Sequence, residues 1–150
     1  MSADAVMRSR VNDLPAPELE PVATTLSKPL SECKVAVVTT AGLKPSGEVE
    51  LWMIGDQSFT VLPGEARDLQ LSHFSPNFDR TGIIQDLNVV YPIDRLQEMA
   101  AAGVIGEVNE RHFSFMGAQM DFSTIIQDTG PAAAQALLDD GVDVVLLTPI

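Results

Sequence analysis

Short, almost continuously apolar runs recur along the chain, and the first clear one is 34–40 (KVAVVTT). It is rich in β-branched residues, which is typical of a strand covered on both faces. Further strands are predicted at 68–73 (DLQLSH), 111–116 (RHFSFM) and 142–148 (VDVVLLT). Between 47 and 63, two short runs flank Gly55-Asp56, which indicates either a β-hairpin or an excursion from the sheet.

Helical spacing replaces the strand pattern in two segments. In 92–102 the apolar residues recur at positions 93, 96, 99 and 100, with Pro92 in the first turn and Gly103 as the stop. A second helix is predicted from Pro131 to Asp140, ended by Gly141, and a helical turn precedes it at 122–129. Strands that alternate with helices predict an α/β fold with a mostly parallel sheet and flanking helices.

The chain divides into two parts by composition. Residues 1–32 carry scattered prolines among acidic, Ser and Thr residues, which predicts an extended N-terminal arm: Pro15, Pro17, Pro21 and Pro29. Residues 33–150 are long enough for one α/β domain with a real core.

Ligands of parallel sheets bind beyond the carboxyl ends of the strands, so the residues at those ends are the candidate site. Ile150 comes directly after the last predicted strand, at this same edge. We therefore expect further sequence to follow it and the domain to be incomplete at its C-terminus. The expected set comprises Thr39, Thr40, Gly42, His73, Phe115, Met116, Gly117, Thr148, Pro149 and Ile150.

Charge and composition exclude several classes of partner. Lys and Arg total 9 against 21 Asp and Glu, a formal net charge of -12 that would repel a nucleic acid. No apolar run approaches the roughly 20 residues that cross a bilayer, and the N-terminus lacks an apolar signal core. The single cysteine, Cys33, cannot form an internal disulfide, which fits a reducing cytoplasm.

Familiar catalytic motifs are absent: the sequence contains no GxxxxGK[ST], GxGxxG, HExxH, CxxC or GxSxG. No metal site is predicted. His73 is the acid/base candidate because it ends a predicted strand; the alternative is a loop histidine that caps a backbone group. His112, inside a strand, is expected to be structural. Cys33 lies at the amino end of its strand, where an inert core thiol is the expected role.

Two polar residues, Asp86 and Asn88, lie in the apolar context IIQDLNVVYP, and Arg95 follows shortly after. Buried polar groups need partners, so these residues are expected either to order the long loop through hydrogen bonds or to contact substrate directly. The candidate substrate-binding set is therefore Thr40, Gly42, Asn88, Arg95, Met116, Gly117 and Thr148.

Four sequence segments, taken together and in this order, are specific enough to indicate a protein family: DLNVVYPIDRL (86–96), GVIGEV with HFSFMG (103–117), DTGPAAAQAL (128–137) and GVDVVLLT (141–148). Over roughly residues 20–150 the chain resembles the glycine/sarcosine/betaine/D-proline reductase family, and most closely the selenoprotein subunits of its D-proline branch. The arm PVATTLSKPL, which leads into a strand ending in TTAG, is similar too.

This resemblance implies a function. In that family the last of these strands is followed at once by a selenocysteine, or a cysteine in some members. Its selenol attacks a substrate carbon that a pyruvoyl-bearing partner subunit has activated as a Schiff base, and a C–N bond is cleaved reductively. The nucleophile is thus expected just after Ile150. The implied cofactor is the partner's pyruvoyl group, and the implied partners are that subunit, an amino-acid substrate and further subunits of an oligomer.

Three functions are compatible with the sequence. The first is an oxidoreductase subunit that lacks its nucleophile in these 150 residues and is inactive in this form. The second is a non-catalytic binding or assembly module derived from the family, and the third is a thiol enzyme that uses Cys33. If a covering helix follows the last strand, the 150-residue chain is expected to be poorly soluble or marginally folded, because each exposed large apolar side chain forfeits about 1.5–3 kcal/mol.

Overall fold

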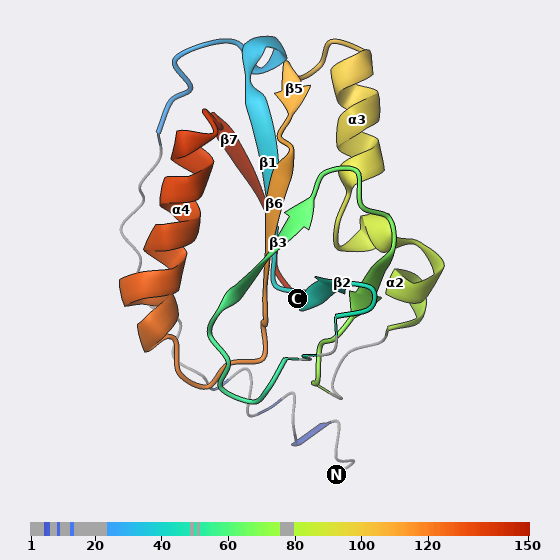
Figure 1. Cartoon of the computed structure of the whole chain (residues 1–150), viewed down its shortest axis with the longest axis vertical. Helices are drawn as coiled ribbons and strands as arrows, with labels where there is room; N and C mark the ends of the chain where they lie inside the picture. Colours follow the sequence, from blue (N-terminus) through green and yellow to red (C-terminus); the bar gives the residue numbers. More distant parts are fainter. Residues whose placement is uncertain are drawn as a thin grey trace.

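A computed structural model describes residues 24–48, 50, 52–75 and 80–150, together with residues 5, 6, 9 and 13. Its centre is a five-stranded sheet built around β1 (Lys34–Thr39). On one side, β5 (Glu107–Val108) and β6 (Arg111–Phe115) run parallel to β1, and on the other side β7 (Val144–Thr148) does so too. β3 (Phe59–Pro63) joins β6 in the antiparallel sense (Figure 1). The predicted α/β class with a mostly parallel sheet is confirmed.

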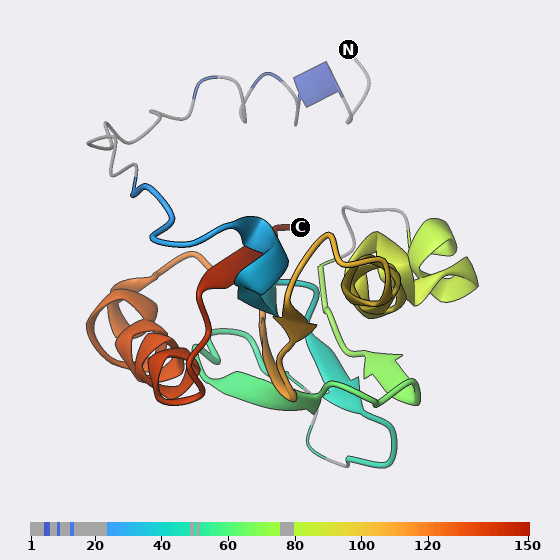
Figure 2. The ribbon, with the colours of Figure 1, turned by 90° about the horizontal axis from the view of Figure 1, so that it is seen from above.

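Helices cover both faces of this sheet, which explains the continuous apolar pattern of β1 (Figure 2). Val35 and Val37 pack into one cluster with Ile93 and Leu96 of α3 (Ile93–Ala101). Ala36 packs into a second cluster with residues of α4 (Gly130–Asp139) and of β6. Successive residues of a strand point to opposite faces, so a strand between two helical layers needs apolar residues at successive positions along its middle, as in 35–38.

The two main helices begin and end close to the predicted residues. Gly103 has a φ of +70°, the left-handed conformation of a helix stop, and Val104 N–H donates to Met99 O at 2.9 Å. The predicted turn at 122–129 is a π-helical segment, η3 (Ile125–Thr129). The stretch before α3 also contains a short helix, α2 (Thr81–Gln85), and a 3-10 turn, η2 (Leu87–Val89), which the sequence pattern did not reveal.

The strand predicted at 68–73 is present as β4 (Leu69–Leu71), but it does not belong to the main sheet. It pairs antiparallel with β2 (Leu43–Pro45) in a separate two-stranded sheet. The physical reason is that all three β4 residues are only half-buried, whereas a central parallel strand needs apolar cover on both faces.

The region 47–63 follows the excursion alternative, not the hairpin. Around Gly55-Asp56 the described residues make only a turn, in which Asp56 N–H donates to Met53 O at 3.0 Å. The second run becomes β3, and its partner is β6 in place of the first run. The chain thus leaves the sheet after β1 and returns to it by β3.

The parallel ladder beside β1 contains an insertion. Val35 pairs with Val108 and Val38 pairs with Phe113. The two β1 residues between these pairs (36 and 37) therefore lie opposite four residues (109–112) of the β5–β6 segment. The side chain of His112 fills this gap, because its Nδ1 accepts the N–H of Val37 at 3.0 Å. The expectation that His112 is structural agrees with this contact.

The N-terminal arm predicted for 1–32 falls mostly outside the described residues, and it stays a prediction there. Of its last part, Leu30–Glu32 forms a 3-10 turn, η1, and Lys28 Nζ pairs with Asp143 at 2.7 Å. Within the described part of the chain, no helix has the length and apolar character needed to cross a membrane.

Candidate functional site

The carboxyl ends of three parallel strands meet at one edge of the sheet, as expected. Thr39 of β1 is level with Ser114 of β6 and with Thr148 of β7. One step further, Ala41 forms a bridge with Met116. Gly117 N–H then donates to the carbonyl of Thr40 at 2.9 Å. The structure therefore brings together the predicted residues of β1, β6 and β7.

His73 reaches this edge by an unexpected route. The small sheet places β4 beside β2, and Ser72 N–H donates to Gly42 O at 3.0 Å. Gly42 has a φ of +64°, and a Cβ there would lie 2.7 Å from Met116 Cε and 3.2 Å from His73 Cα. Only glycine fits both the conformation and the space. Gly42 is thus the point where β1, β6 and the His73 segment touch.

The imidazole of His73 is almost completely buried, with 5% of its residue surface exposed. Its Nδ1 accepts the N–H of Ser75 at 3.2 Å, while Arg80 Nη2 donates to His73 O at 2.8 Å. Burial, and secondarily the Arg80 charge, lower the pKa of His73. A neutral imidazole whose Nδ1 accepts a hydrogen bond carries its proton on Nε2. His73 therefore makes the backbone contact of the alternative interpretation, and its Nε2–H can donate a hydrogen bond.

The tip of β7 is held by its neighbours. Thr39 Oγ1 donates to Thr148 O at 3.2 Å, and Thr148 Oγ1 donates to Val90 O at 2.8 Å. Thr40 Oγ1 accepts the N–H of Ile150 at 2.8 Å. These bonds tie the tip of β7 to β1 and to the segment that leads into α3.

Asn88 lies in that leading segment and orders it. Its Nδ2 donates to both Asp86 Oδ1 and Asp94 Oδ2 at 2.9 Å, and its Oδ1 accepts the N–H of Asp94 at 3.1 Å. Hydrogen bonds from Asn88, and then from Arg67, lower the pKa of Asp94. The contacts are those of the loop-ordering alternative; contact of Asn88 with substrate stays a prediction.

Arg95 pairs with a neighbour on its own helix. Its side chain is largely exposed on α3 and pairs with Glu98 at 2.7 Å. The structure gives it no hydrogen bond to the strand-end residues, so a substrate contact through Arg95 also stays a prediction.

An apolar groove of about 480 Å³ opens beside the site, between α4 and the β7 side of the sheet. Met116, Gly117 and Leu147 link it to the strand ends. Polar groups hardly contribute to its walls, so it suits an apolar side chain better than a charged ligand. Its other walls come mainly from α4, η3 and the loop before them: Phe122, Ile125, Gly130, Ala133, Ala134 and Leu137.

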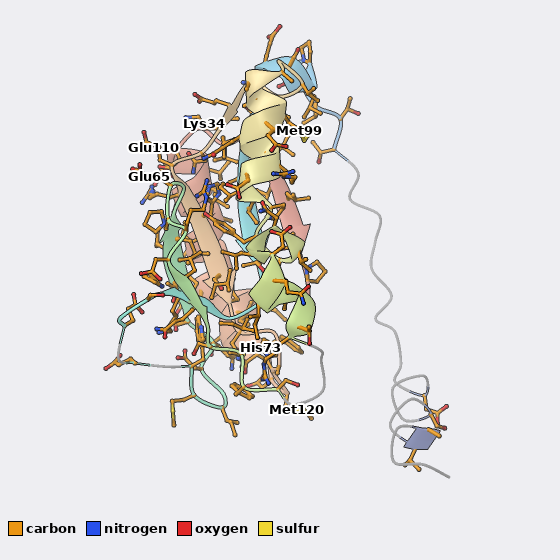
Figure 3. All side chains as sticks on the ribbon, turned by 90° about the vertical axis from the view of Figure 1, so that its right-hand side faces the viewer. Lys34, Glu65, His73, Met99, Glu110 and Met120 are labelled. Carbon is orange, nitrogen blue, oxygen red and sulfur yellow. The ribbon has the colours of Figure 1, made fainter. Side chains whose placement is uncertain are left out.

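A larger cavity of about 610 Å³ lies at the opposite, amino ends of the strands, around Gly64, Asn109 and Arg111. The charged groups nearby satisfy one another, because Arg111 pairs with Asp140 and Lys34 pairs with Glu107. Figure 3 places Lys34 and Glu110 at this end and His73 at the other. The carboxyl-end site is therefore the better candidate.

Other chemistry finds little support in the described residues. No group of three or more His, Cys, Asp or Glu side chains among them could hold a metal ion. Cys33 is fully buried, and its Sγ donates to Pro29 O at 3.3 Å at the amino end of β1. A substrate could not reach that thiol without local unfolding.

Sequence reasoning missed the role of Ser114. It is fully buried in β6, and its Oγ accepts the N–H of Leu43 at 2.8 Å, which joins the small sheet to the main one. The available signal was one hydroxyl in an otherwise apolar run, FSFM, because a buried polar group implies a specific partner.

Comparison with known proteins extends this picture. Residues 10–150 match the family model of glycine/sarcosine/betaine reductase selenoprotein B. The D-proline reductase subunit gamma of Acetoanaerobium sticklandii is 36% identical over 130 residues, which cover 85% of this chain and 53% of that protein. No solved structure matches the chain.

Two further relatives are subunits of multi-component complexes. The sarcosine reductase complex component B subunit beta of Peptoclostridium acidaminophilum is 27% identical over 81% of this chain and 29% of its own length. The glycine reductase complex component B subunit gamma of Carboxydothermus hydrogenoformans is 29% identical over 91% of this chain and 32% of its own. The chain thus spans about half the length of the D-proline reductase relative and about a third of the other two.

Proposed function

The chain belongs to the glycine/sarcosine/betaine reductase selenoprotein B family, and on that premise we propose that it forms part of a reductase subunit that cleaves a C–N bond of an amino acid or related amine. The redox nucleophile, a selenol or thiol, is carried by the residue that follows Ile150. The observation that carries this proposal is the set of hydrogen bonds that hold the tip of β7 at the carboxyl edge of the sheet.

The chemistry suits this position. A selenol is ionised at pH 7, and a thiol whose pKa is lowered reacts in the same way, so either can attack carbon without a separate base. The attacking selenium or sulfur supplies an electron pair to the carbon, the C–N pair leaves with nitrogen, and nitrogen takes up a proton. A second thiol then releases the carbon product and is oxidised with the first to a disulfide or selenosulfide, and an external dithiol reduces it.

We propose that His73 supplies this proton from Nε2, as an imidazolium that has first taken up a proton from solvent. It is neutral above its lowered pKa and holds its proton on Nε2, and it packs against Gly42 at the same edge. We assign the pyruvoyl group to a partner subunit, where it withdraws electrons from the substrate when bound. Two relatives named as subunits of multi-component complexes support the existence of such a partner.

The test begins with the DNA beyond codon 150. A UGA codon or a cysteine codon at the next position, in frame with further coding sequence, is expected. The full-length gene product, expressed with its partner subunits, is then assayed with glycine, sarcosine, betaine and D-proline in the presence of a dithiol. Replacing the residue after Ile150 by alanine should abolish turnover, whereas unchanged turnover contradicts the proposal.

A paired test separates the two roles of His73. In His73→Asn the amide oxygen can still accept the N–H of Ser75, but the Nε2 proton is lost. If His73 is the acid, kcat falls by about 10²–10⁴ with little change in stability. If His73 only caps the backbone, His73→Asn keeps its activity while His73→Ala is destabilised.

The second candidate, a binding or assembly module, is favoured by the apolar groove and by the exposed β7 face. A full-length product that associates with its partner subunits but never turns over any of the four substrates would support it.

A further inference from the structure

The hydroxyl group of Thr40 forms hydrogen bonds with both the main-chain nitrogen and the main-chain oxygen of Ile150. Thr40 Oγ1 accepts the N–H of Ile150 at 2.8 Å and donates its own proton to Ile150 O at 3.3 Å. The backbone N–H of Thr40 also donates to Thr148 O at 3.3 Å. A hydroxyl can act as donor and acceptor at once, which is why threonine can make both side-chain contacts and valine, with nearly the same shape, can make neither.

Gly117 also contacts this pair of residues, and we call the arrangement of Thr40 and Gly117 around Ile150 the cradle. Its N–H donates to Thr40 O at 2.9 Å, and a Cβ at this position would lie 2.6 Å from Ile150 O. The Ile150 carbonyl therefore lies in a space that only glycine leaves open. Residues just beyond a strand usually lose order, but here side-chain and backbone contacts replace the missing ladder.

We infer that Thr40 is a positioning residue for the redox nucleophile. This inference rests on the proposed function, because it takes the nucleophile to be the residue after Ile150. With the main-chain nitrogen and oxygen of Ile150 both held by Thr40, the direction in which the chain leaves Ile150 toward that residue is restrained. Displacement of a reacting group by about 1 Å costs on the order of 10²-fold in rate, so such a restraint has a measurable consequence.

The first experiment uses the 150-residue chain with a cysteine appended directly after Ile150 and labelled with a nitroxide. Cys33 is fully buried, so mass spectrometry is expected to find one label per chain. Thr40→Val should narrow the spin-label spectrum and speed exchange of the Ile150 amide by about tenfold or more, whereas Thr40→Ser keeps the parent values. Thr60→Val makes the same chemical change on β3, at the far side of the sheet, and should leave both readouts unchanged.

An immobile label in a folded Thr40→Val chain, or a Thr40→Ser spectrum identical to that of Thr40→Val, overturns the inference. If Thr40→Val does not fold, the parent chain still decides, because an Ile150 amide that exchanges at the rate of an unprotected peptide is incompatible with the cradle.

The second experiment separates this inference from the proposed function. In the full-length reductase with its partners, Thr40→Val should lower kcat by about 10–100-fold with KM changed less than about twofold, and Thr40→Ser should restore most of it. A parent reductase without any activity contradicts the proposed function alone, since the label result stands by itself. An active Thr40→Val reductase with unchanged kcat contradicts the positioning role alone.

Discussion

His112 Nδ1 accepts the backbone N–H of Val37 at 3.0 Å, and so a side chain takes the place of a missing ladder bond at the centre of the sheet. Both residues are fully buried. Without this contact the insertion between β5 and β6 would leave a buried N–H of the central strand without an acceptor.

Replacing His112 by leucine is therefore expected to lower the free energy of unfolding by about 1–3 kcal/mol, the usual cost of an unsatisfied buried N–H. Urea unfolding measures the change. His112→Asn is the matched control, because its amide oxygen can take the position of Nδ1 and should recover part of the loss. Equal stabilities of the Leu and Asn variants would show that the Val37 contact contributes nothing.

The same residue makes stability depend on pH. Burial lowers the pKa of His112 to about 4, whereas an unfolded histidine titrates near 6.5. The unfolded chain therefore binds a proton between these values and the folded chain does not, so stability falls as pH decreases from about 6.5 to about 4, by roughly 2–4 kcal/mol. Above pH 6.5 this contribution is constant.

Unfolding of the parent and of His112→Leu at pH 7, 5.5 and 4.5 tests this dependence. The variant should show a shallower decrease because it lacks the titration of His112. The lowered pKa of His73 affects both chains and cancels in the difference. Parallel curves for the two chains would contradict the assignment to His112.

Gly117→Ala should destabilise the chain by about 1–3 kcal/mol and shift the Ile150 amide resonance, because the new methyl group collides with backbone oxygens of Ile150 and Thr40. Gly82→Ala in α2 is the control, since nothing lies within 4 Å of a Cβ there. It is expected to be neutral or slightly stabilising. Comparable losses for both variants would indicate a general backbone effect instead of a local collision.

β7, an edge strand with exposed apolar side chains, should drive self-association of the 150-residue chain. Leu147 is 66% exposed in a strand that pairs with β1 alone among the described strands, and an apolar edge strand pairs readily with other chains. Leu147→Lys is expected to raise the soluble concentration several-fold while it changes the melting temperature by only a few degrees. Light scattering and thermal melts provide the measurement.

Leu138 on α4 offers a matched control, because it is 67% exposed yet does not line the groove beside β7. Leu138→Lys should improve solubility much less. An equal improvement would mean that apolar surface in general, and not the β7 edge, causes the association.

The sequence pattern predicted the elements that bury a whole face. The apolar run 34–40 and the helical spacing of 92–102 are each long enough to fit one type of secondary structure only. A parallel sheet then places Thr40, Met116 and Thr148 at a common edge. The partners of short strands could not be predicted in this way. Leu69–Leu71 is only three residues long, so the alternation of two leucines around Gln70 is too short to specify its partner strand.

Side-chain contacts between residues far apart in the sequence could not be predicted either. The insertion beside β1 is visible only once the register of β5 and β6 is known, so no pattern in the sequence could pair His112 with Val37. The position of His73 was predicted correctly at the site edge but for the wrong reason, because the small sheet and Gly42 bring it there, not a strand of the main sheet.

The order in which the ribosome makes the strands has a consequence for this site. β1 is synthesised early, but its partners on both sides come much later, and the bond between Thr39 and Thr148 spans 109 residues. Pairings this distant in sequence form slowly, and until they form the apolar β1 has no neighbour. The contacts around Thr40 therefore form only after the ribosome has made β7, so the position proposed for the nucleophile takes shape after all five strands of the described sheet have been synthesised.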